Sequence, residues 1–358
     1  MTHHGRSISP SRPPSLSLAL VVALALAGCG SSAPSATRAH PPSLTPRASA
    51  QASPGSTQTT ATATSAPAAT SALAANSALA ATSPSPGDMD VFFITSSGKL
   101  DVDTYNGTSW AGPTALPGTP RAGTSLAATS PSTGYANLFF INSSGQLVSD
   151  SWTSSGGWHY SAVELPGTPE PDTPLAATSP SKGDMDVFFI GFVFIGNDQL
   201  REDAYSSSAG WAGPGLAPGT PLLGAPLAAT SCSGEVFITY MPNNSNQFAL
   251  DAYSSGGWVG PVALLGAPEP EAGTGLTMTC PSAGDESSFY ITTSGQMEIV
   301  WWLAPTTLPG APEARWGLAA TSPSTRDMDV LFISSSGQLV SDGWNGSAWS
   351  PGTAALPV

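Results

Sequence analysis

The chain of 358 residues contains 24 acidic and ten basic residues, and every acidic residue lies beyond residue 87. Only six basic residues share that region, so residues 88–358 have a net charge of −18. A field of this sign repels nucleic acid and anionic lipid headgroups. The charge therefore excludes nucleic acid as a partner of this part of the chain.

Residues 1–28 are predicted to be a lipoprotein signal peptide. Arg6 and Arg12 precede an apolar run from Leu16 to Ala27, which is too short to span a bilayer and typical of a signal sequence. The run ends in Leu-Ala-Gly-Cys29, which resembles the lipobox of bacterial lipoproteins. The resemblance implies lipidation of Cys29, export, and anchoring on the outer face of a bacterial membrane through the lipid alone. The alternative is an ordinary signal peptide with a chance cysteine.

Residues 29–75 are predicted to form a disordered stalk. Beyond Cys29 this segment is nearly all Ser, Ala, Thr, Pro and Gln, with no aromatic and no acidic residue. Such a composition buries too little apolar surface to offset the entropy lost on ordering.

Residues 76–358 contain six homologous repeats. The sequence Leu-Ala-Ala-Thr-Ser recurs, with one degenerate copy, at intervals of 42 to 52 residues, beginning at Leu79, Leu126, Leu175, Leu227, Leu276 and Leu318. Each repeat then has an apolar strand, a turn, a strand of the form Leu-x-x-Asp-x-Trp/Tyr, and a Trp-containing stretch that ends near Leu-Pro-Gly-Thr-Pro. This order predicts four short strands in each repeat.

The repeat predicts an all-β fold, a six-bladed β-propeller of four-stranded blades that follows the disordered stalk. Small side chains in the first strand suit the centre, where inner strands converge. Pro113, Pro214 and Pro261 place the fourth strand at the outer edge, because proline cannot donate to a ladder. A β-solenoid would have far shorter periods, and six separate modules would need linkers that the sequence lacks.

Repeat one contains Asp90-Val91-Phe92-Phe93, then Gly98-Lys99-Leu100, then Trp110. This pattern resembles the blades of bacterial and fungal propeller lectins, including the six-bladed fucose-binding type and the seven-bladed type of insect-pathogenic bacteria. The resemblance extends over residues 79–358. It implies carbohydrate binding without catalysis. The fucose-binding family places Arg at the start of the second strand and Glu in the third, whereas this chain has no Arg at the first position. The aligned residues are Asp90, Asn137, Asp186, Glu235, Ser287 and Asp329, and the family's Glu is matched only by Glu202. Fucose specificity is therefore not implied.

The candidate ligand-binding residues are repeated acids and aromatic rings expected on one rim of the propeller. Acids accept hydrogen bonds from sugar hydroxyls, and a ring covers the apolar face of a sugar. The set comprises Asp90, Asp103, Tyr105, Trp110, Asp150, Trp152, Trp158, Asp186, Asp203, Tyr205, Trp211, Asp251, Tyr253, Trp258, Asp329, Asp342, Trp344 and Trp349. The alternative is structural: each Asp caps a turn and each Trp separates neighbouring blades.

Neither a catalytic site nor a cofactor nor a metal is expected. The repeats contain one histidine, His159, no His/Cys cluster with metal-ligand spacing, and no glycine-rich phosphate loop. A glycosidase carboxylate pair and a Ca²⁺ site at the Asp-Met-Asp pairs remain alternatives. The expected partner is a glycan or a surface protein, and the runner-up function is a structural or protein-interaction propeller without a sugar site.

Two further features are predicted. The third repeat has four extra residues around Phe192 and Phe194, which would expose apolar surface for self-association or partner docking. Cys232 and Cys280 end the first strands of consecutive repeats, where inner strands converge, and they are expected to form a disulfide in an exported protein. Two buried free thiols are the alternative.

The lipid anchor can be tested at Cys29. We expect Cys29→Ser to release the protein from membranes or to stall its processing, because this thiol is the acceptor of the lipid. Membrane fractionation and electrophoretic mobility measure the change. A variant that stays membrane-bound with unchanged mobility would show that the chain is not a lipoprotein.

Overall fold

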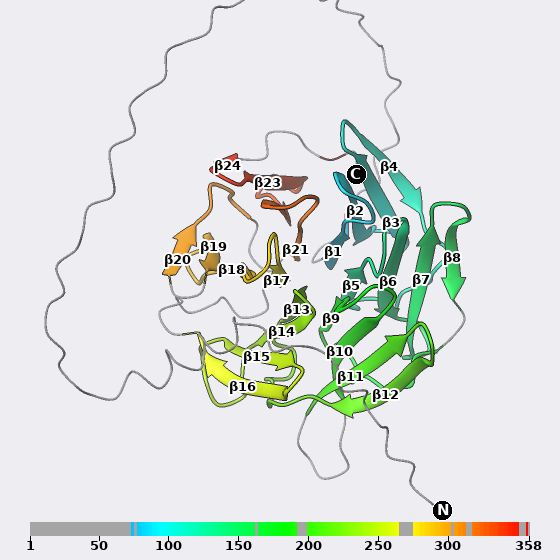
Figure 1. Ribbon diagram of the computed structural model, residues 1–358. Coiled ribbons are helices and arrows are strands. Elements are labelled where there is room, and N and C mark those ends of the chain that lie inside the picture. Colours follow the sequence, from blue (N-terminus) through cyan, green and yellow to red (C-terminus); the bar gives the residue numbers. More distant parts are fainter. Residues whose placement is uncertain are drawn as a thin grey trace, which may run out of the picture. The chain divides into compact units, whose positions relative to one another are not determined.

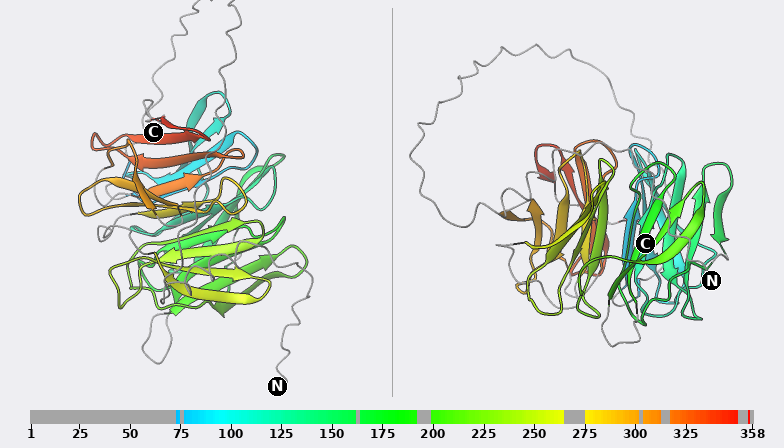
Figure 2. Two further views of the ribbon diagram at one scale, coloured as in Figure 1. Left: turned by 60° about the vertical axis from the view of Figure 1, so that its left-hand side comes forward. Right: turned by 60° about the horizontal axis from the view of Figure 1, so that its bottom comes forward.

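The computed structural model shows six separate four-stranded antiparallel sheets arranged around a common axis (Figure 1). It describes residues 73–74, 77–161, 164–191, 199–264, 275–301, 304–312, 317–350 and 356. Figure 2 shows each sheet as a twisted blade. The predicted six-bladed β-propeller is confirmed.

The strands follow the repeat, four to a blade. The innermost strands are β1 (Leu79–Thr82), β5 (Leu126–Thr129), β9 (Leu175–Thr178), β13 (Leu227–Cys232), β17 (Leu276–Thr279) and β21 (Leu318–Thr321). The second strands are β2 (Asp88–Ile94), β6 (Tyr135–Ile141), β10 (Met185–Gly191), β14 (Glu235–Tyr240), β18 (Ser287–Ile291) and β22 (Asp327–Ile333). The third strands are β3 (Leu100–Asn106), β7 (Leu147–Thr153), β11 (Gln199–Ser206), β15 (Ala249–Ser254), β19 (Met297–Trp301) and β23 (Leu339–Asn345). The outer strands are β4 (Trp110–Ala115), β8 (Gly157–Ser161), β12 (Gly210–Leu216), β16 (Gly257–Ala263), β20 (Ala304–Thr307) and β24 (Trp349–Ser350).

Sequence order and spatial order agree within every blade. The first strand of each repeat contacts the first strands of both neighbouring blades, and β1 contacts β21 to close the ring. Their small residues line a narrow central channel of about 160 Å³. Pro113, Pro214 and Pro261 lie in outer strands, as predicted from their missing N–H.

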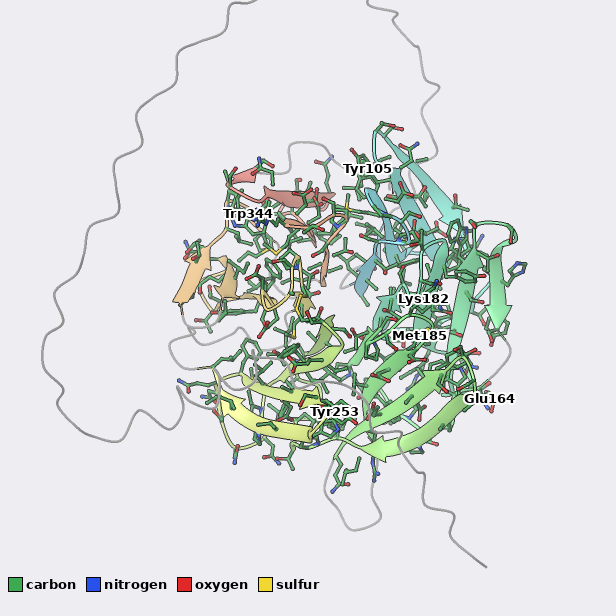
Figure 3. All side chains as sticks on the ribbon, in the orientation of Figure 1. Tyr105, Glu164, Lys182, Met185, Tyr253 and Trp344 are labelled. Atoms are coloured by element: carbon green, nitrogen blue, oxygen red, sulfur yellow. A yellow bond between two sulfur atoms is a disulfide. The ribbon has the colours of Figure 1, made fainter. Side chains whose placement is uncertain are left out.

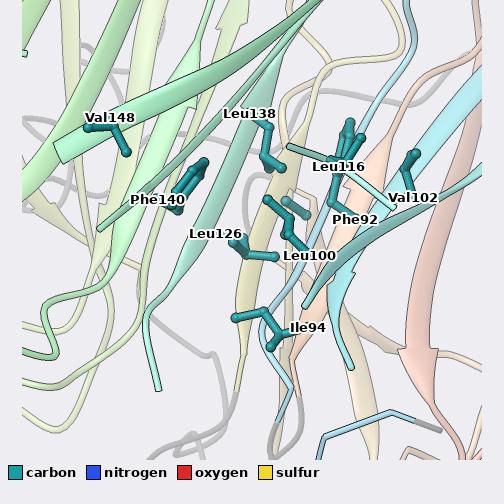
Figure 4. Packing of buried hydrophobic residues seen from close by; sticks show 10 residues of the cluster. Phe92, Ile94, Leu100, Val102, Leu116, Leu126, Leu138, Phe140 and Val148 are labelled. Carbon is teal, nitrogen blue, oxygen red and sulfur yellow. The ribbon is translucent and has the colours of Figure 1, made fainter. Parts of the chain in front are cut away.

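The hydrophobic core is divided among the contacts between blades. Between blades 1 and 2, Phe92 and Leu100 of the first blade pack against Leu126, Leu138 and Phe140 of the second (Figure 4). The other face of blade 1 packs on blade 6. The second strand is therefore apolar along most of its length because both of its faces are buried.

Tryptophans of the outer strands take part in this packing. Trp158 of blade 2 meets Phe92 of blade 1 edge to face, with ring centroids 5.4 Å apart. Trp211, Trp258 and Trp349 make the same contact with a phenylalanine of the preceding blade. Each of these tryptophans thus joins two blades, and the pairing contributes roughly 0.5–1.5 kcal/mol beyond the burial of its area.

Hydroxyl groups join neighbouring inner strands. Thr82 donates to Ser130 of the next blade at 3.1 Å, and equivalent Thr–Ser bonds join blades 3 and 4, 5 and 6, and 6 and 1. At the contact of blades 4 and 5 the serine position is Cys280. It forms a disulfide with Cys232, and the two Cα atoms are 5.8 Å apart. The predicted pairing is therefore present in the structure.

Blade 6 meets blade 1 through both ends of the described chain. Leu356 packs among Leu79, Val91 and Phe93 of blade 1 and donates its N–H to Leu339 of blade 6. Leu73 forms a β-bridge with Thr95 of blade 1. Other neighbouring blades are joined by one continuous linker. Between blades 6 and 1, the segments around Leu356 and Leu73 take the place of that linker.

Several predicted features lie outside the described residues. These are the signal peptide, Cys29, the stalk apart from Leu73 and Ala74, and the extra residues at Phe192 and Phe194 of blade 3. Leu73 and Ala74, which were predicted to belong to the stalk, bind to blade 1. Within the ranges given above, no helix of the length and hydropathy needed to cross a membrane occurs.

The disulfide can be tested by thiol labelling. The bond closes a loop of 48 residues, for which the chain-entropy model gives about 4 kcal/mol of stabilisation. We expect no reactive thiol at Cys232 or Cys280 in denatured, unreduced protein, and a lower denaturation midpoint for Cys232→Ser/Cys280→Ser. Labelling of both thiols would contradict the bond.

Candidate functional site

The aromatic residues singled out in the repeats lie near one end of the blades, beside the start of the second strand. In blade 1, Tyr105 pairs with Met89 on one side and with Trp110 on the other. The Tyr105 and Trp110 rings lie 5.2 Å apart, and blades 3, 4 and 6 have equivalent pairs at 5.3, 5.2 and 5.6 Å. In blade 2 the pair is Trp152 and Trp158. Figure 3 shows members of these pairs, Tyr105, Tyr253 and Trp344, in three different blades. All ten rings are half-buried.

The acids at the start of the second strand face the opposite way. Asp90 shares a strand face with Phe92, which meets Trp158 of blade 2. Tyr105 and Trp110 of the same blade pack toward blade 6. An acid and an aromatic pair therefore meet only across a contact between two blades, and any ligand site is shared by two repeats.

The repeated aspartates of the third strand are buried beneath the aromatic pairs. Asp103, Asp150, Asp203 and Asp251 have 0% of their surface exposed, and Asp342 has 1%. Asp150, Asp203 and Asp342 accept the N–H of Gly118, Gly167 and Gly310 in the linker from the preceding blade, at 2.9, 2.7 and 2.7 Å. These carboxylates hold the linker between two blades.

No room exists for a ligand beside these aspartates. A Cβ placed on Gly112, Gly213 or Gly260 of the outer strand would lie 2.1–2.2 Å from an oxygen of Asp103, Asp203 or Asp251. The outer strand thus covers the carboxylate on the side away from the linker. The burial of the third-strand aspartates does not support their predicted contact with a ligand, and three of them bond to a linker where the alternative expected them to cap a turn.

The second-strand acids are also poorly accessible. Asp90 and Asp186 are 6% and 8% exposed, and Asp329 is half-buried. The register also corrects one alignment, because Thr230 pairs with Phe237 whereas Thr82 pairs with Asp90. Phe237, and not Glu235, therefore occupies the Asp90 position in blade 4.

Burial raises the pKa of many of these carboxyl groups. Desolvation by burial, with smaller contributions from neighbouring acids, raises the pKa of Asp90 and Asp103 to about 7. Burial also raises the pKa of Asp150 and Asp203 to about 6, although the glycine N–H bonds oppose the shift. Burial and the nearby Asp203 raise the pKa of Glu202 to about 7. These carboxyl groups are therefore partly protonated near neutral pH, as expected for carboxyl groups that are shielded from water.

One hollow opens to solvent between blades 2 and 3. Blade 3 supplies Tyr205 and Trp211, whose rings are tilted by 57° with centroids 5.3 Å apart. The wall opposite comes from the end of blade 2 and its linker. The full set of lining residues is Ser161, Glu164, Pro166, Tyr205, Gly210 and Trp211.

Glu164 distinguishes this hollow from the equivalent places at the other contacts. It is exposed and directly precedes the buried Leu165 of the linker. The equivalent residues of the other five repeats carry no charge; they are Ala115, Leu216, Ala263, Thr307 and Ala355. Only the contact of blades 2 and 3 therefore adds a linker carboxylate to the aromatic pair.

The chemistry of the hollow suits a ligand with hydroxyl groups and an apolar face. Glu164 accepts hydrogen bonds, the Ser161 hydroxyl donates or accepts them, and the two rings offer apolar area. Among the residues that the structure describes, no group of three or more His, Cys, Asp or Glu side chains is arranged to hold a metal ion.

Of the six lining residues, the repeated pattern predicts Tyr205 and Trp211 but not Ser161, Glu164, Pro166 or Gly210. A signal for Glu164 exists in the sequence, because it is the one acid at its position in the six repeats. Comparing repeats for what differs, and not only for what recurs, would have found it.

Comparison with known proteins supports the fold. No family model matches the chain, and no curated protein matches it at a significant level. Among solved structures, the six-bladed fungal lectin of Aleuria aurantia is 20% identical, with a TM-score of 0.65, over 80% of this chain and 97% of the lectin. AofleA from Arthrobotrys oligospora is 17% identical, with a TM-score of 0.67, over 80% and 88%. The BP39L lectin from Burkholderia pseudomallei is 19% identical, with a TM-score of 0.61, over 80% and 86%.

The raised pKa values predict the pH dependence of stability. Carboxyls with a pKa of about 6–7 in the fold and about 4 in the unfolded chain keep protons that unfolding releases. Stability is then full below about pH 4 and falls as the pH rises to about 7. The net charge of residues 88–358 acts in the same direction.

We therefore expect a higher melting temperature at about pH 5 than at about pH 8, measured by calorimetry. Asp203→Asn removes one such group while keeping its shape, so it should flatten the dependence. Stability that rises between these two pH values would contradict the assignment.

Proposed function

We propose that this propeller binds carbohydrate, without catalysis, in the hollow between blades 2 and 3. The observation that carries the proposal is that the half-buried Tyr205–Trp211 pair and Glu164 line the same open hollow. Sugars present apolar ring faces and hydroxyl edges, and this combination matches both. The likeness to lectin propellers supports the same class of ligand.

Fucose specificity is not part of the proposal. The Aleuria aurantia lectin recognises fucose. In this chain the second-strand position assigned to Arg in the fucose-binding family is Asp90 in blade 1, Asn137 in blade 2 and Asp186 in blade 3. The sugar must therefore be recognised by other groups.

We also propose that the propeller acts outside the cell, held to a membrane by lipidated Cys29 and a flexible stalk. The lipobox-like sequence and the composition of residues 29–75 support this placement. A glycan-binding domain on a long tether would be able to reach ligands beyond the membrane surface.

A surface that binds protein is the second candidate function. Leu216, Leu222 and Leu223 are 59%, 43% and 49% exposed. Leu216 ends β12, and Leu222 and Leu223 lie in the linker from blade 3 to blade 4. Exposed apolar side chains gathered in one region are typical of contact surfaces. Loss of association on replacing Leu222 and Leu223, with sugar binding unaffected, would support this second role.

The sugar site can be tested with the full-length protein on a glycan array, followed by titration of the best ligand. We expect Trp211→Ala to weaken binding by about tenfold or more, because it removes one face of the hollow. Trp258→Ala is the matched control, since Trp258 makes the same packing contact one blade further on. Equal effects of the two variants, or no ligand on the array, would contradict the proposal.

A further inference from the structure

We infer that the hollow between blades 2 and 3 selects sugars with a free, positively charged amine, that is, unacetylated amino sugars. The inference rests on the proposed carbohydrate function and names the class of sugar. It is carried by the one carboxylate and the two rings that line the hollow, and by the position of nearby basic residues.

Glu164 is the one charged residue among the six that line the hollow. Water already solvates an exposed carboxylate such as Glu164. A ligand therefore gains the most binding free energy there when a charged donor of the ligand replaces that water. An ammonium group is such a donor, and charge-assisted bonds are about twice as strong as neutral ones. A hydroxyl donor would gain less at the same place.

The two aromatic rings favour the same ligand. The faces of Tyr and Trp carry negative potential and attract cations within about 6 Å of the ring centre. Tyr205 and Trp211 contact each other, with ring centroids 5.3 Å apart and planes tilted by 57°, so a cation in the hollow approaches the pair from its open side.

None of the basic residues Arg201, Lys182 and His159 lines the hollow. Arg201 is four residues from Tyr205 along β11, about 13 Å at the rise of a strand, and its Cγ packs against Gly191 at the end of the blade opposite Tyr205. Figure 3 places Lys182 nearer the central axis, whereas Glu164 lies at the outer perimeter. Nε2 of His159 lies against Gly156 at the turn between β7 and β8.

The same charges disfavour acidic sugars. A uronic acid or a sialic acid would bring a carboxylate toward Glu164 and into the field of a domain with a net charge of −18. Like charges brought together in this way act against the wrong ligand. The hollow therefore separates sugars by the sign of their charge.

The test is calorimetric titration of the full-length protein with four oligosaccharides at about pH 6, where an ordinary amine is protonated. The probes are a glucosamine tetramer, its N-acetylated counterpart, a neutral glucose tetramer and a uronic acid tetramer. We expect the glucosamine tetramer to bind about fivefold more tightly than its acetylated counterpart, as one exposed ion pair allows. The uronic acid tetramer should bind most weakly.

Glu164→Gln should abolish this preference and leave the affinity for the acetylated tetramer unchanged. Glu170→Gln is the matched control, because Glu170 lies in the same linker but does not line the hollow. Equal affinity of the wild-type protein for acetylated and unacetylated tetramers would overturn the amine inference and leave the carbohydrate function standing. Absence of binding to all four probes would count against both.

Discussion

The structure depends on the burial of both faces of every second strand. Val91, Phe92 and Phe93 are each 0% exposed, which requires a neighbouring blade on either side of β2. A single blade would leave one or both faces in water, so it has no stable fold alone. Closure of the ring is therefore a condition of stability for each repeat, and the residues that recur most faithfully serve the contacts between blades.

The contact of blades 4 and 5 shows what happens when these residues change. Thr239 replaces the phenylalanine that meets a Trp elsewhere, and β20 contains no Trp to meet it. Val300 replaces the aspartate that holds the linker. The disulfide of Cys232 with Cys280 lies at this same contact, so a covalent bond joins the two blades where the repeated non-covalent contacts are missing.

This contact also buries acids that other contacts lack. Glu286 takes the position of Met89 and is 7% exposed. Burial, with contributions from Glu235 and Asp285, raises the pKa of Glu286 to about 7. A neutral Glu286 is less costly to bury than a carboxylate, which links the stability of this contact to the pH dependence of the whole ring.

The sequence was sufficient to predict the fold because the repeat length, the glycines of the turns and the prolines of the outer strands each depend on local backbone geometry. It was also sufficient for the pairing of Cys232 with Cys280, since both end inner strands. The sequence was not sufficient to predict that the third-strand aspartates are buried. Alternation along a strand shows on which face of the sheet a side chain lies, but it does not show which other residues cover that side chain. That cover comes from Gly112 of the next strand for Asp103 and from Gly118, 32 residues away in the preceding linker, for Asp150.

The fold depends on residues that recur in the repeats, whereas the candidate site depends on a residue that differs in one repeat. A side chain that every repeat needs for packing, such as Asp203, has little freedom to acquire a ligand. An exposed side chain at the end of a repeat is not part of the buried packing between blades, so it is free to change in one repeat alone. Glu164 is such a position, and it lies beside a Tyr–Trp pair that packing has already fixed. In a ring of six similar contacts, a binding site therefore arises where an exposed residue differs and the buried ones remain the same.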